Sequence, residues 1–233
     1  MVFARYPLTF LLLPLSLCVL PLKMQASSPV DQRHPLSLVT APTEFGLADG
    51  PAWDGWSLTI ADPKNQAANR YVVSKKAFQK GPQGRRFSAS FFNHGHVYVA
   101  DNAEGAILRV ESDRSLTTLH EEDLEADNTR RPNDLVVDRS GGIFFTLTKA
   151  GEVVYLSPDG TAKTVATGVE TANGLILSPD ESILYVAEFL PKRIVAFDVG
   201  EAGALSHRRV FATLDDGNPD LRGADGMTID RAG

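Results

Sequence analysis

Short apolar runs separated by polar turns make up most of this chain. Apolar and polar residues alternate in segments such as 56–62, 96–101 and 142–148, and turn-forming Gly, Pro, Asn and Asp residues lie between such segments. Alternation over a few residues predicts half-buried β-strands rather than helices. We expect strand groups at 56–62 with 70–74, at 87–92 with 96–101 and 106–112, at 134–167, at 174–214, and from Gly226 onward.

Four stretches of the chain open alike, each just before an apolar run. They are ADGPAWD from Ala48, RPNDLVVD from Arg131, TANGLILSPD from Thr171 and GADGMTID from Gly223. Asn133 and Asn173 are 40 residues apart, and Asn173 and Asp225 are 52 residues apart. Four-stranded units at such a period are typical of a β-propeller. A β-sandwich or barrel also has short alternating strands, but it would not repeat its polar opening.

Each opening carries an Asn or Asp at the same point: Asp49, Asn133, Asn173 and Asp225. Equivalent strand starts in a propeller converge on one mouth of the central channel, so we expect these side chains to face one another. Two carboxylates and two amide oxygens form an all-oxygen set, which favours Ca²⁺, Mg²⁺ or Mn²⁺ over Zn²⁺. The competing interpretation is that both Asn residues are ordinary turn residues ahead of strands.

Composition and charge exclude several classes of protein. The chain has 233 residues, of which 43% are hydrophobic and 22% are charged, as in a globular protein with a sizeable core. Its net charge of −6 argues against non-specific nucleic-acid binding. No Gly-x-Ser-x-Gly nucleophile motif occurs. His94 and His96 form a His-x-His pair, but they lie at an expected hairpin corner, so we expect a turn there rather than a metal site.

The N-terminal segment has the pattern of a secretory signal peptide. Arg5 precedes an apolar run at 6–22, and small residues follow it. An uncleaved anchor is the alternative, although the run is short for a membrane span. Cys18, the only cysteine, lies in this run, so an exported mature chain would have no disulfide. We expect a periplasmic or secreted protein with a signal peptide at 1–28, a flexible lead-in at 29–39 and a β-propeller at 40–233.

From about Phe45 to its end the chain resembles the SMP-30/gluconolactonase/LRE-like (regucalcin-type) family. The resemblance is carried by the openings described above, in their order and spacing: DGPAWD, RPND, TANGLILSPDE and ADGMTID. It implies an all-β fold, the six-bladed β-propeller. Because the sequence ends in the turn after the first strand of a fifth unit, we expect an incomplete propeller with about four blades and that strand.

The resemblance also implies a site. It assigns Asp49, Asn173 and Asp225 as ligands of one divalent cation, with Ca²⁺ as the first expectation and Mg²⁺, Mn²⁺ or Zn²⁺ as alternatives. Asn133 and Arg131 would line the substrate pocket, although Arg131 could equally be a solvated loop charge. The family usually has Glu where Asp49 stands. The shorter side chain sets the carboxylate back by about 1.5 Å, so it would bind through water or the cation would shift.

The function that the resemblance implies is metal-dependent hydrolysis of a lactone, such as a sugar lactone. The metal would act as a Lewis acid, a metal-bound water would attack, and Asp225 would accept the proton. The alternatives are a non-catalytic binding propeller, an inactive fragment of the family, or a strictosidine-synthase-like propeller, which the carboxylate and amide set disfavours. Expected partners are a small-molecule lactone, with no nucleic acid and no stable membrane span after signal removal. The family's longer loop after the third blade's second strand is missing here, which leaves the substrate class open.

Overall fold

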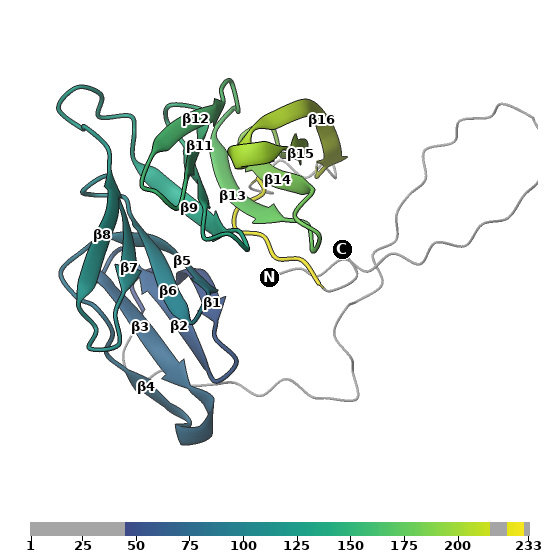
Figure 1. The fold of residues 1–233 in the computed structure, drawn as a ribbon. Helices are drawn as coiled ribbons and strands as arrows, with labels where there is room; N and C mark the ends of the chain where they lie inside the picture. The colour runs from purple at the N-terminus through teal and green to yellow at the C-terminus, as the bar shows by residue number, and fades with distance from the viewer. Residues whose placement is uncertain (1–44, 215–222, 231–233) are drawn as a thin grey trace, which may run out of the picture. The chain divides into compact units, whose positions relative to one another are not determined.

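The structure is a computed structural model that describes residues 45–214 and 223–230. Within these ranges the chain forms four four-stranded sheets and two short 3₁₀ turns, η1 (Val73–Lys75) and η2 (Glu201–Gly203) (Figure 1). Among residues 45–214 and 223–230 there is no helix with the length and hydrophobicity of a membrane span. The expected signal peptide at 1–28 and lead-in at 29–39 lie outside the described residues, so both stay predictions.

The four sheets take their strands in chain order. The first contains β1 (Asp49–Trp53), β2 (Ser57–Asp62), β3 (Ala67–Val72) and β4 (Ala77–Gln79). The second contains β5 (Phe87–Asn93), β6 (His96–Asp101), β7 (Ala106–Val110) and β8 (Leu116–Glu121). The third contains β9 (Pro132–Val137), β10 (Ile143–Leu147), β11 (Glu152–Leu156) and β12 (Ala162–Ala166). The fourth contains β13 (Ala172–Leu177), β14 (Ile183–Glu188), β15 (Arg193–Val199) and β16 (Leu205–Thr213).

Every sheet is an antiparallel meander, and the first strands of successive sheets contact one another: β1 with β5, β5 with β9, and β9 with β13. This arrangement confirms the all-β propeller fold that the repeats predicted. Strands β1, β4 and β8 complete the first two sheets beyond the expected groups. The strand expected from Gly226 is not formed within 223–230, where no neighbouring strand pairs with it.

The turns follow the expected chemistry of Asp, Asn and Gly. Asp138 holds the β9–β10 turn, because its Oδ1 accepts hydrogen bonds from the N–H groups of Ser140 and Gly142, both at 2.8 Å. In the β5–β6 hairpin His94 has φ 49° and Gly95 has φ 80°. Two successive residues at positive φ are typical of a type I′ hairpin turn, so the His-x-His pair belongs to a turn, as expected.

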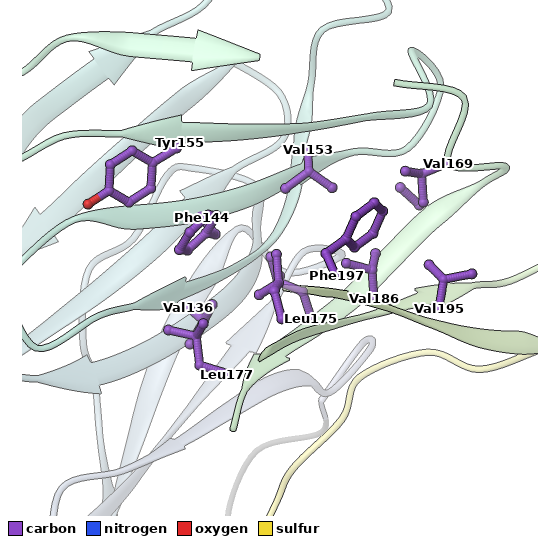
Figure 2. Close-up of a cluster of buried hydrophobic side chains, with 12 residues drawn as sticks. Val136, Phe144, Val153, Tyr155, Val169, Leu175, Leu177, Val186, Val195 and Phe197 are labelled. Atoms are coloured by element: carbon purple, nitrogen blue, oxygen red, sulfur yellow. The ribbon is translucent and has the colours of Figure 1, made fainter. Parts of the chain in front are cut away.

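The hydrophobic core lies between neighbouring sheets. Figure 2 shows the cluster between the third and fourth sheets, in which Phe144 and Tyr155 from one sheet lie near Leu177 and Phe197 from the other. The rings of Phe144 and Tyr155 are 4.7 Å apart between centroids. A second cluster joins the second and third sheets around Phe145. Burial of these side chains between the sheets is the main apolar contribution to stability.

Buried acidic residues end the second strand of three sheets: Asp62, Asp101 and Glu188, each at most 1% exposed. Asp101 contacts Arg85 at 3.0 Å, and Glu188 contacts both Arg193 and Arg208. Because a buried carboxylate is stable only when its oxygens are paired, these acids hold the loops around them in place. The third sheet has the apolar Leu147 at the equivalent position, where it pairs with Pro132 as Asp101 pairs with Phe87.

Strands β1 and β5 approach each other so closely that only glycine fits at one position. Gly50 has φ 39°, and a Cβ added there would lie 2.4 Å from the Cα of Ala89. The Oγ of Ser90 also donates a hydrogen bond to the Gly50 carbonyl. Gly50 therefore fixes where its neighbour Asp49 stands relative to the second sheet.

We expect Gly50→Ala to lower the free energy of unfolding by about 2–4 kcal/mol, because the methyl group meets main-chain atoms that cannot move aside. Gly55→Ala is the matched control, since Gly55 has φ 94° but open space around its Cα. Gly55→Ala should lower the free energy of unfolding by only about 1–2 kcal/mol, because alanine disfavours a positive φ. Urea unfolding followed by circular dichroism measures both, and equal losses would contradict the close approach.

Candidate functional site

The register of the sheets shows which residues are equivalent. Phe87 pairs with Asp101, Pro132 with Leu147, and Ala172 with Glu188, so these pairs occupy the same place in three sheets. The residues that follow Phe87, Pro132 and Ala172 on the first strands are then also equivalent to one another. Together with the matching ADG stretches, the equivalent set is Asp49, Ser88, Asn133, Asn173 and Asp225. Ser88 is a member that the sequence motifs did not indicate.

The start of every first strand is irregular at this point. The register with the second strand shifts between Asp49 and Ala52, between Phe87 and Ala89, and between Ala172 and Leu175; for β9 the shift lies opposite Phe145 to Leu147. A bulge breaks the ladder and turns a side chain away from its regular direction. Recurring bulges at the first four members of this set therefore mark this end of the first strands as specialised.

Asp49 and Asp225 are close enough to influence each other. Asp49 is partly buried and its Oδ1 accepts a hydrogen bond from the N–H of Gly50 at 2.9 Å. Burial raises the pKa of Asp49, and the nearby charge of Asp225 raises it further. Asp225 is exposed, and its carbonyl oxygen would lie 2.1 Å from a Cβ added at Gly174, so its backbone packs against β13. These two residues from separate parts of the chain thus lie within electrostatic reach of each other.

A third carboxylate, Asp134, lies within electrostatic reach of Asp49 and Asp225. Its oxygens accept hydrogen bonds from the N–H groups of Leu135 at 2.8 Å and Leu175 at 3.4 Å. Burial raises the pKa of Asp134 to about 7, and the charges of Asp49 and Asp225 add to the effect. Such a carboxylate binds a proton that an ordinary aspartate has lost. The sequence motifs assign no role to Asp134.

A comparison of the repeats would have singled out Asp134. The residue after each member of the equivalent set is small in the other units, namely Gly50, Ala89, Gly174 and Gly226. Only the third unit puts a charged side chain there. Because RPND is also typical of a turn ahead of a strand, the motif alone does not show that Asp134 is unusual at this position.

Asn133 and Asn173 have their main-chain carbonyls held by hydroxyl groups. Ser88 Oγ donates to the carbonyl of Asn133 at 2.7 Å, and Thr146 Oγ1 donates to that of Asn173 at 2.8 Å. Both Asn side chains are partly buried. Among the described residues no hydrogen bond engages either side-chain amide, so these amide oxygens are available to a ligand.

Arg131 is tied to the second sheet's loops. Its Nη1 donates to the carbonyls of Asn102, at 3.1 Å, and Ala103, and its Nε donates to that of Asn128 at 3.1 Å. It is therefore anchored rather than a freely solvated charge. The neighbouring Arg130 is engaged separately, by Glu122 and Glu152.

The types of side chain present determine how a cation could be bound here. In residues 45–214 and 223–230 no three His, Cys, Asp or Glu side chains converge closely enough to hold a metal ion by themselves. A cation here would therefore need amide or main-chain oxygens beside the carboxylates of Asp49 and Asp225. Asn173 supplies such an amide, and an all-oxygen set of this kind fits Ca²⁺ or Mg²⁺ in ligand type.

A hollow lies at this end of the third and fourth sheets. It is lined by the turn after β10 (148–151) and by the connection into β13 (168–171). Because Leu147 pairs with Pro132, and because Thr171 lies two residues before Asn173, the hollow is at the same end of the strands as Asn133 and Asn173. Thr171 has φ 53°, which a β-branched residue rarely adopts.

Comparison with known proteins decides the family. The model of the SMP-30/gluconolactonase/LRE-like region matches residues 47–233. The chain belongs to this family. It is 30% identical to a gluconolactonase of Zymomonas mobilis over 88% of this chain and 67% of that protein. It is 34% identical to the pentonolactonase XacC of Haloferax volcanii over 82% of this chain and 66% of that protein.

Solved structures agree with the family. A gluconolactonase from Xanthomonas campestris matches with a TM-score of 0.66 and 27% identity, over 80% of this chain and 67% of that one. A calcium-binding regucalcin from Agrobacterium tumefaciens matches with a TM-score of 0.60 at 15% identity, over 72% of this chain and 60% of that one, and supports the fold alone. This family member thus spans about two thirds of the length of its lactonase relatives.

The raised pKa of Asp134 predicts a pH-dependent stability. Its folded value of about 7 lies above the ordinary 3.8, so between these values the folded chain binds a proton that the unfolded chain has released. The contribution of Asp134 to stability therefore falls as the pH rises through this window and levels off above it. We expect Asp134→Asn to remove this fall, by about 1.4 kcal/mol for each unit of pKa difference.

Urea unfolding between about pH 4 and pH 8, with a chelator present, measures this effect. The difference between the variant and the unmodified protein should grow in favour of Asp134→Asn as the pH rises. Glu121→Gln is the control, because Glu121 is exposed at the end of β8. Parallel pH curves for all three proteins would show that Asp134 titrates normally.

Proposed function

We propose that this protein hydrolyses a lactone of the sugar-lactone type with the help of one divalent cation. Membership of the family, and relatives named as gluconolactonase and pentonolactonase, support the lactone as substrate class. The observation that carries the proposal is that Asp49, Asp134 and Asp225 lie within electrostatic reach of one another, at strand positions equivalent or adjacent to those of Asn133 and Asn173. Unbalanced negative charge in one place favours a cation.

The cation would be held by Asp49, Asn173 and Asp225. Two carboxylates balance its charge, and the Asn173 amide adds a neutral oxygen. Ca²⁺ is our first expectation, with Mg²⁺, Mn²⁺ and Zn²⁺ as alternatives. Asp49 already accepts the N–H of Gly50 through Oδ1, so Oδ2 is the oxygen that would serve as a ligand.

A bound cation of this kind supplies Lewis-acid polarisation of the lactone carbonyl and lowers the pKa of a water molecule beside it. Asp225 is exposed and would accept a proton from that water. Asn133 would orient the substrate through its side-chain amide. Arg131, whose Nε and Nη1 are fixed on carbonyls, would present Nη2 to a substrate oxygen. The hollow at 148–151 and 168–171, whose lining includes Thr148, Lys149 and Glu170, would take the sugar hydroxyls.

We expect the full chain to hydrolyse D-glucono-1,5-lactone only in the presence of a divalent cation. Asp225→Asn should lower kcat/KM by about 100-fold or more, because the carboxylate acts both on the cation and on the water. Glu121→Gln, which removes an exposed carboxylate from β8, should leave kcat/KM unchanged. A pH-stat assay with Ca²⁺, Mg²⁺, Mn²⁺ or Zn²⁺ added in turn to chelator-treated protein gives the measurement.

Two results would count against the enzyme. Hydrolysis that is equal with and without chelator would remove the cation from the proposal. Absence of hydrolysis, combined with cation-dependent binding of the lactone in calorimetry, would favour the second candidate, a binding propeller. The short side chain of Asp49 is the observation that favours this second candidate, because it holds a ligand oxygen farther from the channel than a glutamate would.

A further inference from the structure

The third sheet differs from the others at two neighbouring positions, which a hydrogen bond connects. The first is Asp134 on β9, where the other units have glycine or alanine. The second is Thr146 on β10, where the register places Ala61, Ala100 and Ala187 in the other sheets. Thr146 is completely buried. A hydroxyl in a place otherwise reserved for a methyl group needs a polar reason.

Thr146 joins the two strands that carry the candidate site. Its Oγ1 accepts a hydrogen bond from the N–H of Asp134 at 3.2 Å and donates one to the carbonyl of Asn173 at 2.8 Å. Asp134 in turn accepts the N–H of Leu175 at 3.4 Å. A closed set of contacts thus connects β9, β10 and β13.

The bulges explain why a hydroxyl is needed there. Between Phe145 and Leu147 the β9–β10 ladder is interrupted, and between Ala172 and Leu175 the β13–β14 ladder is interrupted. Main-chain groups inside a bulge lose their ladder partners and must be satisfied in another way when they are buried. Thr146 provides both an acceptor and a donor from one atom, which an alanine cannot do.

The geometry points to Thr146 as a positioning residue for the cation site. By fixing the peptide carbonyl of Asn173 and the peptide N–H of Asp134 on one atom, it sets the backbone from which the Asn173 amide projects. The direction in which the Asn173 side chain leaves the main chain is then set before any ligand arrives, which is how outer contacts commonly orient the residues that bind a metal. This inference rests on the proposed function, because it assigns Asn173 to the cation.

The test compares Thr146→Val, which keeps the shape, with Thr146→Ser, which keeps the hydroxyl. Calorimetric titration of chelator-treated full chain with Ca²⁺ is the readout. We expect Thr146→Val to bind Ca²⁺ about 10-fold or more weakly, and Thr146→Ser to stay within about 3-fold of the unmodified protein. Unfolding midpoints in urea, measured alongside, report the general loss of stability.

Ser178→Ala is the matched control. Ser178 is also buried, and its hydroxyl accepts the N–H of Ile183 at 3.0 Å, but it follows the far end of β13. It should lower the unfolding midpoint without changing Ca²⁺ affinity. If Thr146→Val binds Ca²⁺ as tightly as the unmodified protein, the hydroxyl only stabilises the fold and the inference is wrong.

A protein that binds no Ca²⁺ in any form would refute the proposed cation site, and a second readout then decides on Thr146. In ¹⁵N-labelled protein the side-chain amide of Asn173 should give one sharp pair of NMR signals in the unmodified chain and in Thr146→Ser. Thr146→Val should shift or broaden that pair. Unchanged Asn173 signals in Thr146→Val would show that the hydroxyl does not position this side chain.

Discussion

Close approach between the first strands of neighbouring sheets is the constraint on which this structure depends. A Cβ at Gly50 would lie 2.4 Å from the Cα of Ala89, and one at Gly174 would lie 2.1 Å from the carbonyl oxygen of Asp225. Contacts this short are compatible only with glycine, so side chains near them must project elsewhere. The approach carries residues that are far apart in sequence, such as Asp49 and Asp225, within electrostatic reach of each other.

Hydroxyl groups add hydrogen bonds between neighbouring sheets at these closely packed strand starts. Ser88, Ser90 and Thr146 each donate to a main-chain carbonyl on the neighbouring sheet's first strand. The bulges at these strand starts would otherwise leave buried carbonyls without partners. The same hydrogen bonds join sheets that are otherwise held together by apolar packing. They fix the geometry of the polar end of each interface between sheets, as apolar packing fixes the rest.

The sequence predicted the fold well because the fold repeats. Alternating strands, Asp turns and a recurring opening identified the propeller, and the hairpin at His94 and Gly95 formed as expected. Strand β4 escaped notice because its three residues, Ala77–Gln79, are too few to show alternation. The strand expected from Gly226 needs a neighbour to pair with, and pairing is not a local property.

The site was predicted only in part. Asp49 and Asp225 lie within electrostatic reach of each other, whereas the ligand roles of these residues and of Asn173 stay predictions. Asp134 was missed because its raised pKa comes from burial and from the charges of Asp49 and Asp225, which lie far from it along the chain. Thr146 was missed for a related reason. In a strand it looks like any β-branched residue, and only the alanines at equivalent positions reveal it.

The apolar side chain of Leu147 affects how the adjoining turn at 148–151 is held. In the other three sheets a buried acid at this place fastens the neighbouring loops through ion pairs or main-chain N–H groups, so lengthening the turn there would disturb a charge inside the protein. The turn at 148–151 has no such fastening, and within the described residues the buried hydroxyl of Thr148 has no partner. An insertion in this turn would therefore not expose a buried carboxylate to solvent. The turn lies at the edge of the candidate pocket, so added residues there would change which ligands can enter the pocket.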